Sequence, residues 1–167
     1  MKKLLIFCCL LVGTAVSAQN ADPEKKLAEM GLQLPPVSRP VANYVKAVRT
    51  GNLVFLAGHT SELAGKVGKE VTTEQGYEAA KQTGLSILAS LKAEIGDLKK
   101  VKRCVKVLGM VNCAEGYADQ PKVMNGFSDL MVAVFGDNGK HARSAVGMYA
   151  LPSNKTVEIE LIVEVEN

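Results

Sequence analysis

The sequence predicts one α+β domain in which two helices cover the same face of a mixed sheet, with elements in the order ββαβαββ. Two long segments repeat apolar residues at intervals of three and four, as amphipathic helices do. Five shorter segments alternate in polarity or are rich in β-branched residues, as strands are, and glycine or proline separates most of them. Elements in this order favour a layer of helices on one face of a sheet.

The first eighteen residues have the pattern of an export signal. Two lysines precede an apolar run, Leu4 to Val12, and small residues at 16–18 provide a site for a signal peptidase. The apolar run is shorter than the roughly 20 residues that cross a bilayer. We therefore expect residues 1–18 to be removed, which leaves a periplasmic or secreted chain without a membrane anchor. An uncleaved anchor is the alternative.

The remaining chain of about 149 residues fits a single domain with a real core. The formal charge of +3 includes the two lysines of the signal, so the mature chain is close to neutral and offers no field for nucleic acid or an anionic membrane. Cys104 and Cys113 remain after cleavage. On one extended strand they would lie roughly 30 Å apart and on opposite faces, which predicts no disulfide between them.

Residues 19–40 are predicted to form a short helix and a connector. Asp22 and Pro23 are typical of a helix start, and Gly31 of its end. The pair Pro35-Pro36 then makes a stiff link that cannot continue the helix.

The next segments predict a hairpin, two long helices and a third strand. The hairpin joins 43–50 to 53–58 through Gly51-Asn52. A capping box at 72–75 begins the first long helix, which Gly96 ends. The third strand is predicted over 101–113, and the second helix over 120–135.

The last two strands are predicted over 141–150 and 157–165. The latter places five apolar residues on one face: Val157, Ile159, Leu161, Val163 and Val165. By the same parity, four residues are expected to face the core from the former strand (Ser144, Val146, Met148 and Ala150), and four to face away (Arg143, Ala145, Gly147 and Tyr149). The face without helices then mixes apolar and charged residues, so we expect oligomerisation through the sheet. A solvated face in a monomer is the alternative.

Few residues offer chemistry. The two histidines, His59 and His141, could line a cleft or be ordinary loop residues, and no cysteine or histidine pair has metal-binding spacing, so no metal site is predicted. Arg143 offers a planar fork for a carboxylate, or an interface salt bridge. Glu158 fits either a solvated strand carboxylate or a proton-transfer group.

Several stretches resemble one known family. They are GNLVFLAGH, TTEQGYEAAKQTGLSIL, the segment with Asn125 and Phe127, and ARSAVGMYALPSNKTVEIELI. Together they resemble the Rid (YjgF) family, also called the endoribonuclease L-PSP or chorismate-mutase-like family, from Val41 to Glu166. This chain looks like a divergent, exported member, with residues 41–167 as its Rid/YjgF-like domain.

The resemblance implies a homotrimer with its sheets around a central barrel, and ligand clefts between subunits. Family enzymes hydrolyse reactive imines and enamines such as 2-aminoacrylate to 2-keto acids and ammonia, without a cofactor or metal. By this resemblance Arg143 grips the substrate carboxylate and Glu158 positions the attacking water. Tyr44 and Asn125 contact the ligand, and His59 and His141 are further candidates for the cleft.

Two positions depart from the typical family pattern. Ala145 stands where deaminases carry a cysteine, and Ala57-Gly58-His59 where they often have Ser-Gly-Gln. Two function classes therefore stay open. The first is an exported, metal-independent imine and enamine hydrolase. The second is a non-catalytic trimer that binds small carboxylate-bearing molecules or protects proteins.

Overall fold

The computed structural model describes residues 22–166, and the predicted export signal at 1–18 lies outside this range. The strands are β1 (Ala47–Thr50), β2 (Leu53–Thr60), β3 (Val101–Asn112), β4 (Ala142–Met148) and β5 (Val157–Val165). The helices are α1 (Pro23–Glu29), α2 (Thr73–Ile95) and α3 (Gln120–Phe135), with 3-10 turns η1 (Leu98–Lys100), η2 (Gly136–Gly139) and η3 (Pro152–Asn154). The described helices do not include one that is long and apolar enough to cross a membrane.

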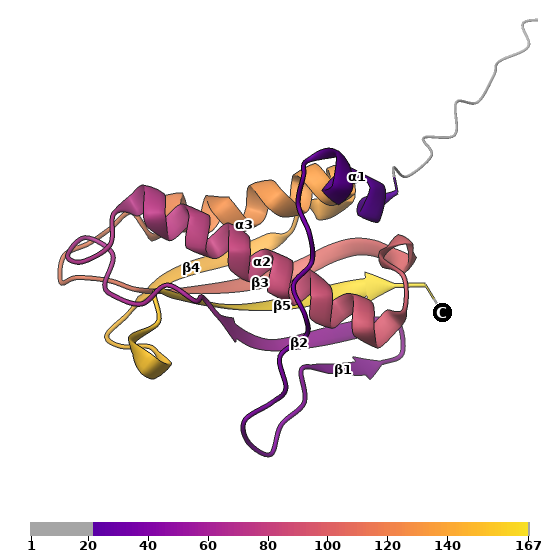
Figure 1. Cartoon of the computed structure of the whole chain (residues 1–167), viewed down its shortest axis with the longest axis horizontal. Coiled ribbons are helices and arrows are strands. Elements are labelled where there is room, and N and C mark those ends of the chain that lie inside the picture. Colours follow the sequence, from indigo (N-terminus) through magenta and orange to yellow (C-terminus); the bar gives the residue numbers. More distant parts are fainter. Residues whose placement is uncertain (1–21, 167) are drawn as a thin grey trace, which may run out of the picture.

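The five strands form one mixed sheet in the order β1-β2-β5-β3-β4. Neighbours are antiparallel except β3 and β4, which run parallel. Helices α2 and α3 cross one face of this sheet, and α1 lies on the same side (Figure 1). The predicted α+β class, the element order and the mixed sheet are confirmed.

The core lies between the sheet and α2 and α3. All five apolar residues predicted for the inner face of β5 are completely buried. The two helices approach closely at two glycines: a Cβ atom at Gly84 would lie 2.9 Å from Cδ2 of Leu130, and one at Gly126 would overlap the backbone carbonyl of Tyr77. This close approach brings the outer surface of α3 beside β4, where the site described below lies.

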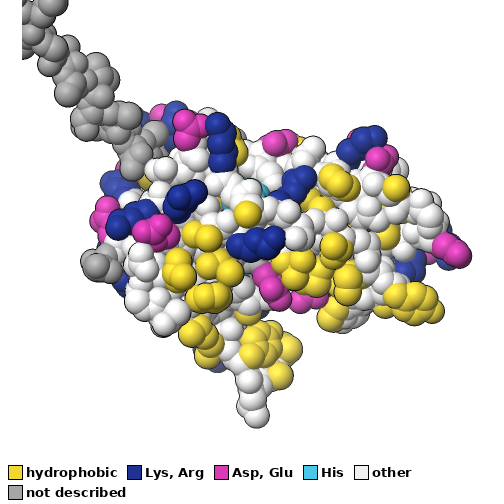
Figure 2. Space-filling view, turned by 180° about the vertical axis from the view of Figure 1, so that it is seen from behind, with side chains coloured by type: hydrophobic (Ala, Val, Ile, Leu, Met, Phe, Trp, Pro, Cys, Tyr) yellow, Lys and Arg dark blue, Asp and Glu magenta, His cyan; other side chains and the backbone are white. Residues whose placement is uncertain are grey.

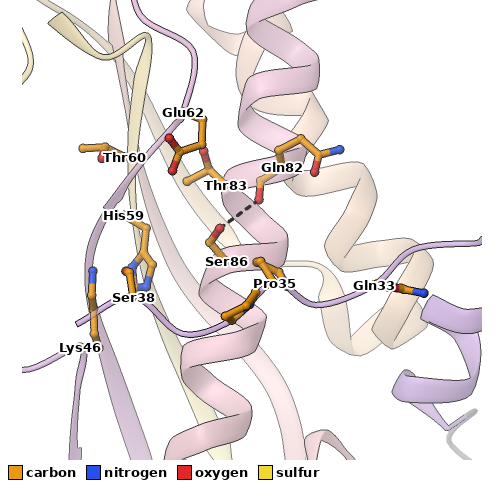
Figure 3. Close-up of a pocket in the computed structure, with 11 residues that line it drawn as sticks. Gln33, Pro35, Ser38, Lys46, His59, Thr60, Glu62, Gln82, Thr83 and Ser86 are labelled. Atoms are coloured by element: carbon orange, nitrogen blue, oxygen red, sulfur yellow. Dashed lines mark hydrogen bonds between the residues drawn. The ribbon is translucent and has the colours of Figure 1, made fainter. Parts of the chain in front are cut away.

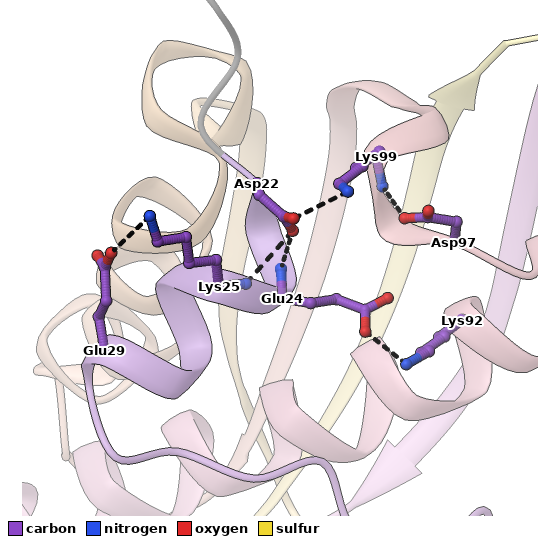
Figure 4. A network of polar contacts seen from close by, with 7 residues as sticks. All are labelled: Asp22, Glu24, Lys25, Glu29, Lys92, Asp97 and Lys99. Atoms are coloured by element: carbon purple, nitrogen blue, oxygen red, sulfur yellow. Dashed lines mark hydrogen bonds and ion pairs between the residues drawn. The ribbon is translucent and has the colours of Figure 1, made fainter.

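Ion pairs fasten α1 to the main domain (Figure 4). The Asp22 carboxylate caps the helix and lies 2.8 Å from Nζ of Lys99, while Nζ of Lys92 on α2 lies 2.6 Å from Glu24. The connector that follows therefore begins from a fixed point. It then runs toward β1, which starts at Ala47 and not at residue 43 as the alternating pattern predicted.

The predicted faces of β4 are wrong. Arg143, Ala145 and Gly147 point toward α3, whereas Ser144 accepts a hydrogen bond from Lys106 on the opposite face and Val146 is 38% exposed. The predicted inward positions of Val146 and Met148 followed hydrophobicity, which is a weak guide on an edge strand because only part of that strand is covered.

The space available beneath α3 explains why the two faces of β4 are the reverse of those predicted. A Cβ atom at Gly147 would lie 2.8 Å from Nε2 of Gln120 and 2.9 Å from Sγ of Cys113. The side chain of Met124 likewise occupies the space over Gly109, which pairs with Ala145. Side chains of α3 and Cys113 thus fill the space over Ala145 and Gly147, where only small residues fit, whereas Arg143 extends beside α3 to Asn125 and Ser128.

The two cysteines lie on the same side of the sheet, which corrects the prediction of opposite faces. Pairing between β3 and β5 shifts between Cys104 and Lys106, so both Cys104 and Val107 point into the core. Cys113 packs against the core from the same side. Both thiols are free, and burial raises the pKa of Cys104 to about 12.

The other face of the sheet carries no helix of the described chain. Figure 2 shows this side, where hydrophobic patches are interrupted by acidic and basic side chains. Its apolar residues follow the pairing across the sheet: Val48, Phe55, Ile162, Leu108, Met110 and Val146. Glu158 and Glu160 of β5 lie among them, and we call this surface the open face.

Candidate functional site

The guanidinium of Arg143 lies against α3. Its Nη1 atom donates to Oδ1 of Asn125 at 3.0 Å and to Oγ of Ser128 at 2.9 Å. Nη2 makes a longer contact, 3.4 Å, with the carbonyl of Pro121. Because Asn125 and Ser128 are three residues apart, they lie on the same side of the helix and hold one end of the guanidinium.

His141 extends this network. Its Nδ1 atom lies 2.7 Å from the carbonyl of Gly139, and its Nε2 atom lies 3.0 Å from Oγ of Ser128. A carbonyl can only accept, so Nδ1 carries the proton and Nε2 accepts from the Ser128 hydroxyl. That leaves the lone pairs of Oγ for the N–H of Arg143. Burial, with a smaller effect of the Arg143 charge, lowers the pKa of His141, which favours this neutral form.

Arg143 keeps donors for a ligand. Within residues 22–166, no partner is found for its Nε–H or for one of its two Nη2 hydrogens, and no carboxylate forms an ion pair with it. The side chain is partly exposed. A guanidinium that is held at one end and has free N–H groups at the other is suited to a carboxylate.

Glu158 lies on the open face, as the parity of β5 predicts. Its carboxylate lies directly over Gly58, where any Cβ atom would overlap Oε1. It makes no hydrogen bond or ion pair with another residue in the described part of the chain. Burial, with a smaller effect of Glu160, raises the pKa of Glu158 above its usual 4.5. The carboxylate is therefore a better proton acceptor than a fully solvated one.

Tyr44 and His59 lie at the β1 and β2 side of the sheet. Tyr44 precedes β1, is 43% exposed, and has Nζ of Lys46 at 5.8 Å from its ring centre. His59 is buried on the helix side, with Nδ1 at 2.7 Å from the carbonyl of Ala57 and Nε2 at 2.8 Å from Oγ of Ser90. Both ring nitrogens of His59 are thus used within the fold.

The structure therefore divides the predicted site residues into two groups. Arg143, Asn125 and His141 come together on the α3 side of β4, joined by Ser128. Glu158 lies on the opposite face of the sheet, on β5, with β3 between it and β4. Tyr44 and His59 lie with neither. One copy of the chain therefore does not bring Arg143 and Glu158 to the same small molecule.

Sequence reasoning missed Ser128. The available signal was its spacing: it follows Asn125 by three residues on a helix, so it shares the face that was already assigned to the ligand. Residues 22–166 contain no group of three or more histidine, cysteine or acidic side chains that could hold a metal ion.

Comparisons with known proteins agree with this fold. Residues 24–165 match the family described as "YjgF/chorismate mutase-like, putative endoribonuclease". Protein TCP17 of Trypanosoma cruzi is 36% identical over 148 residues, which cover 84% of this chain and 92% of that protein. A 2-iminobutanoate/2-iminopropanoate deaminase of Dermatophagoides farinae is 27% identical over 143 residues, covering 81% and 95%.

Among solved structures, protein Atu1372 of Agrobacterium tumefaciens, whose function is unknown, superposes with a TM-score of 0.81. It is 38% identical, and the match covers 86% of this chain and 92% of that one. The similarity thus extends over almost the whole described chain, including α1 and the connector.

Proposed function

This chain belongs to the YjgF/chorismate mutase-like family, and on that premise we propose that it hydrolyses imines of 2-keto acids, and the enamines that tautomerise to them. Water adds to the carbon of the C=N bond, and the resulting carbinolamine loses ammonia to leave the 2-keto acid. Atoms and charge balance without a metal or a redox partner. The deaminase name of the Dermatophagoides relative supports this reaction class.

The observation that carries the proposal is the anchored guanidinium of Arg143. Asn125 and Ser128 fix one end, and the free N–H groups receive the carboxylate that every 2-imino acid carries. Fixing the carboxylate places the neighbouring imine carbon at a constant distance from the protein. Holding the substrate in this orientation lowers the entropic part of the activation barrier for the addition of water.

Glu158 is proposed to position the water and accept its proton. Its raised pKa and its position over Gly58 give a carboxylate with little competition from neighbouring side chains. In a single chain it lies across the sheet from Arg143. We therefore propose a homotrimer, in which the open face is covered by neighbouring subunits and Glu158 of one subunit meets Arg143 of another. The mixed apolar and charged character of the open face supports this assembly.

The test is hydrolysis by purified residues 19–167. An amino-acid oxidase supplies 2-imino acids, semicarbazide traps them, and a fall in semicarbazone measures hydrolysis. We expect the fall to vanish in Arg143→Ala and to be strongly reduced in Arg143→Lys, which cannot make the same fork. Arg39→Ala is the matched control, because Arg39 is an exposed arginine of the connector, outside both the network and the open face. Hydrolysis that survives Arg143→Ala in a folded protein overturns the proposal.

A second candidate is a non-catalytic trimer that binds carboxylates or protects proteins. Ala145 favours it, because the position that carries a cysteine in typical deaminases has no reactive group here. In this second candidate function, Arg143 binds the carboxylate of the ligand and Glu158 has no role. It predicts that a 2-keto acid binds with equal affinity to the wild type and to Glu158→Ala, with no hydrolysis by either.

We further propose that the protein is exported after cleavage near residue 18. Expression of the full chain in a bacterial host, followed by intact mass measurement of the periplasmic fraction, tests this directly. A mature species that begins near Gln19 is expected. Recovery of the intact chain from the cytoplasm alone contradicts export.

A further inference from the structure

We propose that a cavity between the N-terminal connector, β2 and α2 binds a free α-amino acid, with the carboxylate toward Lys46 and the ammonium toward Glu62. The cavity has a volume of about 310 Å³ and lies on the helix side of the sheet, away from Arg143. It is separate from the proposed hydrolytic site, and the proposal does not depend on imine hydrolysis. Figure 3 shows the residues that line it.

The floor of the cavity is rigid and polar. His59 is 3% exposed, and its ring is fixed from both nitrogens by Ala57 and Ser90. Thr83 of α2, 2% exposed, donates its hydroxyl to the carbonyl of Ala79 at 2.8 Å. Burial lowers the pKa of His59, so the floor is neutral at neutral pH. Charge in the cavity therefore comes from its ends.

The two ends carry opposite charges. In Figure 3, Glu62 lies on one side of His59 and Lys46 on the other, with Thr60 beside Glu62. Lys46 forms no ion pair within residues 22–166, only the contact with the Tyr44 ring. Glu62 has a single long ion pair, 3.7 Å to Nζ of Lys155, and its side chain is fully exposed. A ligand with one negative and one positive group matches this arrangement better than a simple anion does.

The wall between the ends offers hydrogen-bonding capacity. The hydroxyl of Thr60 and the amide of the Gln82 side chain have no side-chain partner in the described structure. The Ser86 hydroxyl makes only a 3.5 Å contact with the carbonyl of Gln82. Polar groups of this kind at a concave surface are typical of small-molecule sites. They suit an amino acid whose own side chain is polar.

The roof can move without breaking structure. Pro35 and Pro36 line the cavity from above, and residues 33–41 make no hydrogen bond with another described backbone group. Both prolines lack an N–H, which explains how this segment crosses α2 without joining the sheet. The connector is fixed at its start by the ion pairs of α1. A segment that is fixed at one end and unbonded along its length can admit a ligand beneath it.

The experiment is titration of purified residues 19–167 with L-glutamine, followed by ¹⁵N amide shifts and by calorimetry. Two analogues separate the charges: glutaramate lacks the ammonium, and 4-aminobutanamide lacks the carboxylate. We expect L-glutamine to shift the amides of Thr60, Gln82 and Ser86, and both analogues to bind at least fivefold more weakly. Lys46→Met and Glu62→Gln should each weaken the binding of L-glutamine by about twofold to fivefold, as for an exposed charge pair.

Three control variants make the result specific. Glu78→Gln and Lys81→Met change charges on α2 outside the cavity and should leave binding unchanged. Arg143→Ala should also leave it unchanged, because a ligand in the hydrolytic site would be lost in that variant instead. Absence of any shift at tens of millimolar L-glutamine, loss of binding in Arg143→Ala, or binding by Lys46→Met and Glu62→Gln as tight as by the wild type overturns the proposal.

Discussion

The Oγ atom of Ser128 lies 2.9 Å from Nη1 of Arg143, so a hydroxyl on α3 fixes the guanidinium that extends from β4. The same hydroxyl donates to His141, and this donation orients its lone pairs toward the arginine. Ser128 and His141 thus act through Arg143 and are positioning residues in the proposed reaction.

Ser128→Ala is expected to raise KM for a 2-imino acid about tenfold while kcat changes little. The lost bond joins a hydroxyl to a charged group, worth about 1.5–3 kcal/mol, and the carboxylate is held equally in the ground and transition states. Semicarbazone kinetics measure both constants. Ser128→Thr keeps the hydroxyl and should restore KM, whereas Ser86→Ala should change neither constant. A fall in kcat with constant KM would contradict the positioning role.

Gly58→Ala is expected to lower kcat at least tenfold with little loss of stability. The added Cβ would overlap Oε1 of Glu158, the far end of a flexible side chain, so the carboxylate moves aside and the backbone does not. A double-mutant cycle checks the cause. In a Glu158→Ala background, Gly58→Ala should have no further effect on kcat. Additive losses would show that Gly58 acts on something other than Glu158.

The sequence predicts faces well where burial is complete and poorly where it is partial. On β5, a central strand, alternation identified every buried residue correctly. On β4, an edge strand, polarity placed Val146 inward and Arg143 outward, although the bulk of α3 side chains dictates the reverse. The register shift near Cys104 likewise has no signal in an alternating pattern, because it depends on pairing between β3 and β5.

The candidate site shows the same division. The residue types at Arg143, Asn125 and Glu158 could be selected from motifs, because carboxylate recognition and proton transfer need those groups. That Arg143 and Glu158 lie on opposite faces could not be read from spacing. It depends on which side of the edge strand has room for a long side chain, and therefore on the packing of α3.

The free energy of unfolding is expected to fall as the pH drops below about 6.5, partly because of the two histidines. Burial lowers the pKa of both His59 and His141 from the usual 6.5, so the unfolded chain binds protons at a higher pH than the folded one. Stability from this source is present above pH 6.5 and is lost as the pH falls toward the folded pKa values.

Urea unfolding at pH 7.5 and 5.5 measures this effect. His59→Gln should lower stability at pH 7.5, because the hydrogen bonds to Ala57 and Ser90 are imperfectly replaced, but its stability should fall less between the two pH values than that of the wild type. An unchanged pH dependence in His59→Gln would show that His59 already titrates in the folded state as it does in the unfolded chain.

Two glycines at the contact of α2 and α3 should respond differently to alanine. At Gly126 the new Cβ would overlap the backbone carbonyl of Tyr77, which cannot move without separating the helices, whereas at Gly84 it meets the ends of the Leu130 and Phe127 side chains. We expect Gly126→Ala to cost about 3 kcal/mol or more, as severe overpacking does, and Gly84→Ala about 1–2 kcal/mol. Urea unfolding measures both.

Since α3 carries Asn125 and Ser128, Gly126→Ala should also raise KM, whereas Gly84→Ala should not. Equal costs for the two variants would mean that α3 shifts freely, and Arg143 could then not be held as the proposed reaction requires.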